Sequence, residues 1–322
     1  MAEEKKENKK RLIVIDGNAV IHRAFHALPP LTTKKGELVN AIYGFLLVFF
    51  KAIKEFQPDF VAATFDFPGP TFRHKKYKLY KAQREKAPEE LYQQIPKVKE
   101  ILKSFNVQIF EKKGFEADDL IGTISKKAPQ KQIFSKIETI ILTGDLDALQ
   151  LVDKNTKVYA LRKGVKDAIL YDKEKVKEKY DGLTPEQLIN FKALRGDPSD
   201  NIPGVLGVGE KTAIALIKEF GTLENLYEEL KENSEKAKKI KQSLRKKLLD
   251  CKKQAFVSKM LAEIKLDVPV EFDLGKCRWG KYDKEKVTQL FKSYEFQTLI
   301  SRLPEKKNEN KDKTIKNNLK LW

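Results

Sequence analysis

The stretch RLIVIDG, residues 11–17, decides the fold, because it is typical of a buried β-strand that ends on an acid. Four apolar residues precede Asp16 without interruption, and Gly17 follows as a turn residue. The pattern returns in FVAATFD (60–66), which ends at Asp66, and in ETIILTGDLD (138–147), which reaches Asp145 and Asp147. In a fourth stretch, VQIFEKKGFEADD (107–119), a strand leads into a helix start that carries Glu116, Asp118 and Asp119.

Helical patterns separate these strands: VNAIYGFLLVFFKAIKEF (39–56), DDLIGTISKKA (118–128) and DALQLV (147–152). This alternation of strands and helices predicts an α/β fold with a doubly wound, mostly parallel sheet. In such a sheet the ligand crevice lies beyond the carboxyl ends of the strands. The acids that end separate strands are therefore expected to meet there.

The chain has 322 residues, which suits one large domain and a smaller one. From about residue 184 the strand patterns give way to helices and turns. We therefore expect an α/β domain at 11–183 and a helical domain at 184–303. The polar ends, 1–10 and 304–322, have the composition of flexible segments.

The net charge of +18 predicts a polyanionic partner, and nucleic acid is the commonest one. A membrane partner is not expected, because no basic amphipathic anchor or lipidation motif stands out. The longest apolar run, AIYGFLLVFF (41–50), is also shorter than the roughly 20 residues needed to span a bilayer. Cys251 and Cys277 form no CxxC or Cys/His pattern, so we expect a protein of the reducing cytoplasm.

Each acid alone has an ordinary structural explanation. Asp118 and Asp119 suit the positive end of a helix dipole, and acids in GDPSDN (196–201) suit Asx turns. As a group gathered in one crevice, however, the acids would repel one another and raise each other's pKa values unless a cation joined them. The group has nine members: Asp16, Asp66, Glu116, Asp118, Asp119, Asp145, Asp147, Asp197 and Asp200.

Oxygen ligands without a His or Cys cluster favour Mg²⁺ or Mn²⁺ over zinc. Calcium stays possible, although the EF-hand spacing is absent. So many acids indicate more than one ion, and two ions about 3.5–4 Å apart are the usual machinery of phosphodiester hydrolysis. The sequence therefore predicts a metal-dependent enzyme that acts on nucleic acid.

Two further stretches favour nucleic-acid binding. GVLGVGEKTA (204–213) is expected to bind a phosphate through its backbone and side chains, although a plain helix-helix turn would show the same glycines. FRHKKYKLYKAQREKAP (72–88) interleaves cations with tyrosines that could stack on unpaired bases, although a solvated lysine-rich helix would also show this mixture. The predicted DNA-binding residues are Tyr77, Tyr80, Gly204, Gly207, Gly209, Lys211 and Thr212.

Five ordered motifs resemble those of the bacterial 5′-to-3′ exonuclease family, which includes the N-terminal domain of DNA polymerase I and belongs to the flap endonuclease superfamily. They are VIDGNAVIHRAFHAL (14–28), TFDFPGPTFRH (64–74), GFEADDLIGT (114–123), ILTGDLDALQLV (141–152) and LRGDPSDNIPGVLGVGEKTA (194–213). The resemblance implies a PIN-like nuclease domain with a helical arch at about 69–112. It also implies a helix-hairpin-helix (H2TH-like) domain that grips duplex DNA and holds K⁺.

The resemblance further implies a role for each of the site residues. One metal position takes Asp16, Asp66, Glu116, Asp118 and Asp119, and the second is completed by Asp145, Asp147, Asp197 and Asp200. Arg73, Lys81 and Arg84 would act at the base of the arch by steering the scissile phosphate and stabilising the transition state. The expected protein is a monomer of the bacterial cytoplasm and nucleoid. It would cut 5′ flaps, nicked or 5′-overhang duplexes, or RNA-DNA primers.

Two other functions remain open from the sequence. A PIN-type ribonuclease also gathers acids at strand ends, although such domains are usually shorter and lack the hairpin. A non-catalytic protein that recognises DNA structure would bind with strong salt dependence but form no Mg²⁺-dependent product.

Overall fold

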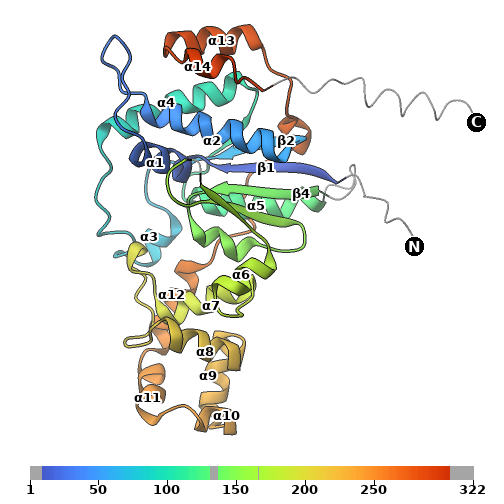
Figure 1. Ribbon diagram of the computed structural model, residues 1–322. Helices are drawn as coiled ribbons and strands as arrows, with labels where there is room; N and C mark the ends of the chain where they lie inside the picture. Colours follow the sequence, from blue (N-terminus) through green and yellow to red (C-terminus); the bar gives the residue numbers. More distant parts are fainter. Residues whose placement is uncertain (1–8, 131–136, 166, 305–322) are drawn as a thin grey trace, which may run out of the picture.

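A computed structural model describes residues 9–130, 137–165 and 167–304 (Figure 1). Its sheet has six strands in the order β3-β2-β1-β4-β5-β6, and all neighbouring strands are parallel except β5 and β6. The predicted doubly wound, mostly parallel sheet is therefore confirmed. The strands are β1 (Lys10–Asp16), β2 (Phe60–Thr64), β3 (Gln108–Phe110), β4 (Ile137–Thr143), β5 (Thr156–Leu161) and β6 (Ala168–Tyr171).

Alternate residues of β1 face two different cores. Leu12 and Val14 are fully buried in the core that includes α5, whereas Ile13 and Ile15 are fully buried in the core under α1, α2 and α4. Figure 1 shows the second group of helices above the sheet and α5 below it. These helices are α1 (Gly17–Ala27), α2 (Asn40–Phe56), α4 (Glu89–Ser104) and α5 (Ala117–Lys127).

The strand register brings the predicted acids to one edge of the sheet. Asp16 pairs with Thr64 of β2, so Asp66 lies only two residues beyond this level. On the other side of β1, Ile15 pairs with Leu142 of β4, so Asp145 also follows closely. Both faces of these strands are apolar, so the close packing of each core sets this register: a slip by one residue would exchange the side chains of the two cores.

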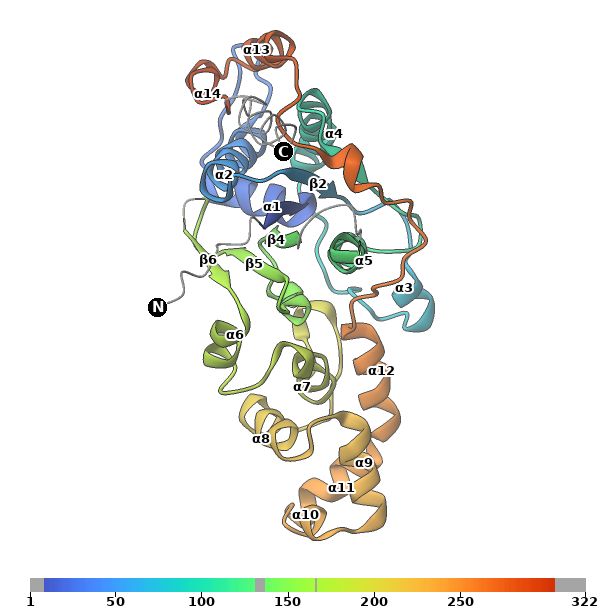
Figure 2. The same ribbon diagram turned by 90° about the vertical axis from the view of Figure 1, so that its right-hand side faces the viewer.

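A helical region extends from the lower edge of the α/β part (Figures 1 and 2). Buried Ile217, Leu226 and Leu248 belong to the same hydrophobic core as Leu12 and Val14, so the two parts share a continuous interior. The helices are α6 (Lys173–Lys179), α7 (Leu188–Arg195), α8 (Glu210–Phe220), α9 (Leu223–Glu232), α10 (Glu235–Lys238), α11 (Gln242–Asp250) and α12 (Lys252–Ala262).

The last helices do not follow the predicted division, which placed all of 184–303 in the helical domain. After α12 the chain returns to the α/β part, where α13 (Lys284–Ser293) and α14 (Gln297–Ile300) lie at the far end from α8–α12 (Figures 1 and 2). Aromatic burial explains the return. Phe291 is fully buried against Phe50 and Phe105, and Trp279 contacts Phe49 edge-on.

The segment expected to form a helical arch, 69–112, is helical over about half of its length, in α3 (Phe72–Lys76) and α4. α3 is short, residues 77–88 contain turns, and α4 begins at Glu89. Lys81 has a left-handed backbone (φ 55°), which an α-helix does not accommodate. The alternative of a lysine-rich helix over 72–88 is therefore wrong beyond Lys76.

Short 3₁₀ helices fill several connections: Ala128–Gln130, Leu146–Leu151, Pro185–Gln187, Pro198–Asp200 and Leu274–Cys277. Among the helices in the described ranges, none combines the length and apolar character needed to cross a bilayer. The predicted flexible ends, 1–10 and 304–322, lie outside the described residues except for Lys9, Lys10 and Pro304.

Candidate active site

The acids at the strand ends are joined by short contacts. Asp16 caps α1 by accepting from the backbone N–H of Ala19 at 3.0 Å, and its other oxygen accepts from the Thr143 hydroxyl at 2.7 Å. The Thr143 Oγ1 accepts in turn from the backbone N–H of Asp145 at 2.9 Å. Across the sheet, Asp66 accepts from the backbone N–H of Ala117 at 2.8 Å. The ends of β1, β2 and β4 and the start of α5 are thus held in one cluster.

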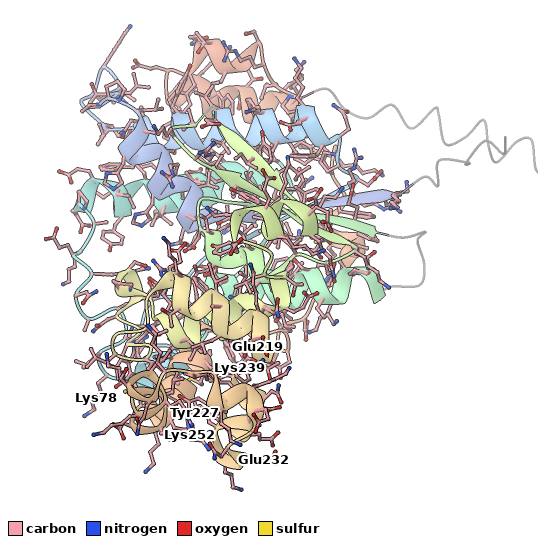
Figure 3. The ribbon with its side chains drawn as sticks, turned by 60° about the horizontal axis from the view of Figure 1, so that its bottom comes forward. Lys78, Glu219, Tyr227, Glu232, Lys239 and Lys252 are labelled. Carbon is pink, nitrogen blue, oxygen red and sulfur yellow. The ribbon has the colours of Figure 1, made fainter. Side chains whose placement is uncertain are left out.

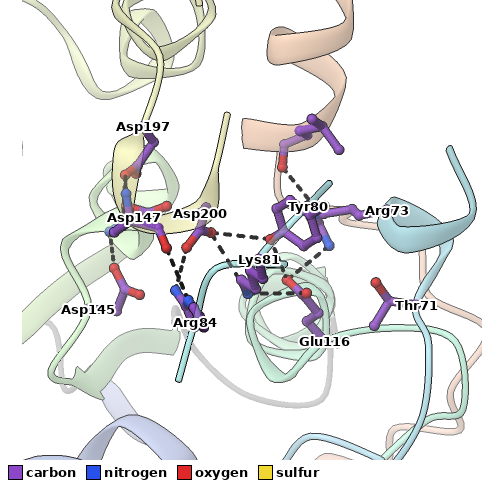
Figure 4. A network of polar contacts seen from close by, with 12 residues as sticks. Thr71, Arg73, Tyr80, Lys81, Arg84, Glu116, Asp145, Asp147, Asp197 and Asp200 are labelled. Atoms are coloured by element: carbon purple, nitrogen blue, oxygen red, sulfur yellow. Dashed lines mark hydrogen bonds and ion pairs between the residues drawn. The ribbon is translucent and has the colours of Figure 1, made fainter. Parts of the chain in front are cut away.

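Glu116 lies at the centre of a second group of contacts (Figure 4). Its Oε1 is 3.2 Å from Lys81 Nζ, and its Oε2 is 3.3 Å from Arg73 and 3.1 Å from the Tyr80 hydroxyl. The same hydroxyl lies 3.2 Å from Asp200. The turn that carries Tyr80 and Lys81 therefore packs directly against Glu116 and Asp200.

Asp200 fixes this turn through both backbone and side chain. The Lys81 backbone N–H donates to the Asp200 carbonyl at 2.9 Å, and Lys81 Nζ lies 3.8 Å from the Asp200 carboxylate. Arg84 forms an ion pair with the same carboxylate (Figure 4). Asp200 is only 7% exposed, so these cations offset the cost of burying its charge.

Asp145, Asp147 and Asp197 form the third group. Asp145 caps the 3₁₀ helix that begins at Leu146 and accepts from the Asp147 backbone N–H at 2.8 Å. Lys192 of α7 bridges the other two acids: its Nζ pairs with Asp147 and lies 2.8 Å from Asp197 Oδ2. The predicted strand pattern over 138–147 therefore ends at Thr143, and the chain turns into the 3₁₀ helix between Asp145 and Asp147.

Burial and mutual repulsion perturb the pKa values of these acids. Burial raises the pKa of Asp16 to about 7, with Asp66 and Asp145 adding repulsion. Burial also raises the pKa of Asp118 well above its usual value, assisted by Asp16 and Asp145, and raises that of Asp147 to about 6. The protein fold thus concentrates negative charge that protons or cations must offset.

The cations already in the cluster offset part of this charge. At Asp197, Lys192 and Ser199 outweigh the effect of burial and lower the pKa to about 2. Within residues 9–130, 137–165 and 167–304, no three acid, His or Cys side chains lie close enough to hold a metal ion. Lys81, Arg84 and Lys192 stand among the carboxylates instead. The donor set is oxygen-only and suits a hard divalent cation, but binding one requires these cations to shift.

Arg73 and Asp119 do not lie where a phosphate or a metal could reach them. Arg73 is 2% exposed and donates five hydrogen bonds, two of them to Asp119 at 2.8 Å. Asp119 is fully buried on the inner face of α5 and also accepts from the Lys265 backbone N–H. The structure therefore contradicts the predicted roles of this pair, which acts as a buried tie.

The two tyrosines do not form the predicted stacking platform. Tyr80 is 3% exposed, packs against Ile202 and Leu261, and contacts acids through its hydroxyl. Tyr77 is half-buried against the same small cluster. Their rings fill the space under the turn and cover Leu261, so they are not free to stack on bases.

The glycine hairpin connects α7 to α8, as expected for a helix-hairpin-helix. Gly204 (φ 65°) and Gly207 (φ 78°) have left-handed backbones, and a Cβ at Gly204 would lie 2.3 Å from the Gly196 nitrogen. Gly209 caps α8, whose first turn contains exposed Lys211 and half-buried Thr212. Gly204 and Gly207 are therefore required by the turn itself, with or without a phosphate, whereas Gly209 has an extended backbone (φ -85°) and open space where a Cβ would lie.

Sequence reasoning missed two residues of the cluster, Thr143 and Lys192. Both stand beside predicted acids: Thr143 is two residues before Asp145, and Lys192 is five before Asp197. A polar residue at the end of an apolar strand was a usable signal for Thr143. No local pattern distinguishes Lys192 from the many surface lysines.

Comparison with known families agrees with this geometry. Residues 11–181 match the N-terminal resolvase-like domain of 5′-3′ exonucleases, and residues 183–285 match the C-terminal SAM fold of the same enzymes. The chain belongs to the 5′-to-3′ exonuclease family. The family resemblance noted from the motifs is therefore confirmed.

Proteins that are similar to this chain in sequence include bacterial DNA polymerases I. DNA polymerase I of Bacillus subtilis is 43% identical over 297 residues, which cover 92% of this chain and 32% of that protein. The thermostable DNA polymerase I of Thermus thermophilus is 40% identical over 272 residues, covering 84% of this chain and 31% of that protein. The chain thus spans about a third of the length of these relatives.

Solved structures share the fold. T5 5′-exonuclease, determined with bound zinc, has a TM-score of 0.65 at 21% identity and covers 79% of this chain and 90% of its own. The catalytic core of Rad2 in complex with DNA substrate has a TM-score of 0.55 at 20% identity, covering 89% and 87%. These likenesses confirm the nuclease fold class of the family, with its added helical domain.

The raised acid pKa values predict how stability depends on pH. Asp16 keeps its proton up to about pH 7 in the folded protein but releases it near 3.8 when unfolded. In EDTA, the free energy of unfolding should therefore fall by on the order of a few kcal/mol as pH rises from about 4 to 7. Thermal melts across this range would measure it. Asp16→Asn should flatten the dependence, and an unchanged slope in that variant would contradict the assignment.

Proposed function

We propose that this chain is a structure-specific 5′-to-3′ exonuclease and 5′-flap endonuclease that hydrolyses DNA phosphodiesters with two divalent ions. Mg²⁺ is the proposed ion, with Mn²⁺ able to replace it. The observation that carries the proposal is the convergence of acids from three strand ends, α5 and the Asp197–Asn201 turn beneath a basic segment. Its proposed role is the removal of flaps or RNA primers in replication and repair.

The acids fall into two groups that fit two ions. Asp16, Asp66, Glu116 and Asp118 lie around the start of α5, whereas Asp145, Asp147, Asp197 and Asp200 lie toward α7. We assign each group to one ion and leave out Asp119, because Arg73 occupies both of its oxygens. Divalent ions bound there would activate water and stabilise charge on the attacking and leaving oxygens.

Lys81 and Arg84 are the proposed phosphate-steering residues. Both come from the turn between α3 and α4, and their side chains are 21% and 48% exposed. Their positive charge at the edge of the acid cluster would attract a phosphodiester to carboxylates that alone would repel it. Arg84 can also present a planar pair of donors to phosphate oxygens.

The helical region is the proposed duplex-binding part. The hairpin presents the start of α8 with Lys211 and Thr212, where backbone N–H groups and the helix dipole suit a phosphate. A K⁺ ion at the hairpin belongs to the same proposal. Exposed lysines of α10–α12 add positive charge, and Figure 3 shows Lys239 and Lys252 at this end of the molecule.

The comparisons support DNA as the substrate and a divalent ion as the cofactor. The T5 5′-exonuclease binds divalent metal ions, and the Rad2 core was determined with DNA substrate. We extend both properties to this chain. We further propose that it acts as a monomer in the bacterial cytoplasm at the nucleoid, with a DNA-binding helical region at 184–262 and a nuclease domain formed by 11–183 together with the returning segment that carries α13 and α14.

A labelled 5′-flap duplex incubated with Mg²⁺ or EDTA tests the proposed function. We expect cleavage near the junction with Mg²⁺ and none with EDTA. Equal cleavage of single-stranded RNA and flap DNA would instead favour a PIN-type ribonuclease. Tight, salt-sensitive binding without any Mg²⁺-dependent product would indicate a non-catalytic DNA-binding protein.

A further inference from the structure

Lys192 holds an unusual position, because its charge sits between two acids of one proposed metal site. The residue lies on α7, and its Nζ contacts both Asp147 and Asp197. Its side chain is 13% exposed, as is that of Asp197. An ammonium group is therefore buried in the space between two carboxylates that the proposed function assigns to a divalent ion.

The local charge balance favours a cation of higher charge than the lysine ammonium between Asp147 and Asp197. One ammonium carries a single positive charge, whereas Asp147 and Asp197 together carry two negative charges when ionised. Asp145 adds further repulsion, since its charge helps to raise the pKa of Asp147. The bridge therefore leaves the group net negative, and a doubly charged ion would neutralise it more fully.

The lysine and a divalent ion exclude one another at these oxygens. The ammonium contacts the same two carboxylates that would become ligands, and two cations placed between them would repel strongly at low solvent exposure. The lysine side chain has four rotatable methylenes, so its charge can move away while α7 stays in place. The buried tie formed by Arg73 differs, because five hydrogen bonds hold its guanidinium.

We propose that Lys192 is the internal counter-cation of the Asp147–Asp197 pair, holding it together in the metal-free protein and competing with the divalent ion there. This inference rests on the proposed metal-dependent function. Lys192 is then a positioning residue that sets the ion concentration at which the site fills. The protein would remain folded without metal, and occupancy of this site would follow the divalent-ion supply.

Lys192→Met tests the competition directly, with Mn²⁺ binding measured by titration calorimetry and stability by thermal melts. Without the competing ammonium, the site at Asp147 and Asp197 should bind Mn²⁺ about tenfold or more tightly, because binding no longer has to displace a bound group. The melting temperature in EDTA should fall, since two buried carboxylates lose their partner. Saturating Mn²⁺ should restore it to the parental value measured with Mn²⁺.

Controls separate this inference from the proposed function. Lys218→Met removes a similar contact, 2.8 Å from Lys218 Nζ to Asp181, away from the acid cluster and should leave Mn²⁺ affinity unchanged. If the parent protein binds no Mn²⁺, the proposed function fails. If the parent binds Mn²⁺ but Lys192→Met binds it equally or more weakly, Lys192 supports the ligands and only the inference is overturned. Lys192→Gln, measured in the same way, decides the question if the methionine variant does not fold.

Discussion

Replacing Arg73 with methionine is expected to lower the free energy of unfolding by about 3–5 kcal/mol, because the change leaves a buried carboxylate without its partner. Asp119 is fully buried and shares two hydrogen bonds of 2.8 Å with the guanidinium. Methionine keeps much of the volume but offers no donor. Urea denaturation followed by circular dichroism would measure the loss.

The loss should exceed that of an ordinary ion pair, because Arg73 joins three separate segments. It lies on α3, pairs with Asp119 of α5, and donates to the backbone carbonyls of Leu261 and Glu263 at the end of α12. The residue therefore ties the base of the basic turn to the sheet and to the helical region. A destabilised variant should also lose this alignment.

Arg84→Met provides the matched control for the stability effect. The Arg84 side chain is 48% exposed and pairs with Asp200. In the variant, Asp200 would still have Lys81 as a cationic partner. We expect its free energy of unfolding to change by less than about 1 kcal/mol. The proposed function predicts that this variant nevertheless loses flap cleavage. If Arg73→Met has parental stability, the buried contacts of Arg73 are not needed for folding. The predicted role of Arg73 in phosphate steering would then be considered again.

The sheet and its acid-bearing edge could be predicted because their signals are local. An apolar β-branched run followed by an acid is visible in seven residues, and parallel strands bring such ends together without further information. The return of α13 to α2 and α4 could not be predicted in this way. Phe291 and Trp279 are buried by contacts with residues far away in sequence, and no local pattern specifies their partners.

Within the site, sequence reasoning failed where the side chains of adjacent residues point in different directions. Asp118 and Asp119 are adjacent, but a helix turns by about 100° between successive residues, so only one of them can face the strand ends. Asp119 faces inward to Arg73, and Asp118 stays partly exposed near Asp16 and Asp145. The sequence shows the two carboxylates but not the direction of each. A buried arginine 46 residues away determines the difference.

Asp118→Asn should reduce flap cleavage on the order of 10³-fold, since removing a ligand from a metal that stabilises charge costs several kcal/mol in the transition state. The same change should not destabilise the protein in EDTA. Burial, and then repulsion from Asp16, Asp145 and Asp147, disfavour the charged form of Asp118, and a neutral amide removes that cost.

Three measurements on one protein therefore distinguish a metal ligand from a structural residue. Single-turnover cleavage should be lost in Asp118→Asn while fluorescence anisotropy still detects near-parental binding of the flap DNA. The thermal melt in EDTA should be equal to or above that of the parent, opposite in direction to Arg73→Met. Asp181→Asn, which changes an exposed acid paired with Lys218, should cut at the parental rate. Parental cleavage by Asp118→Asn would remove this carboxylate from the proposed metal ligands.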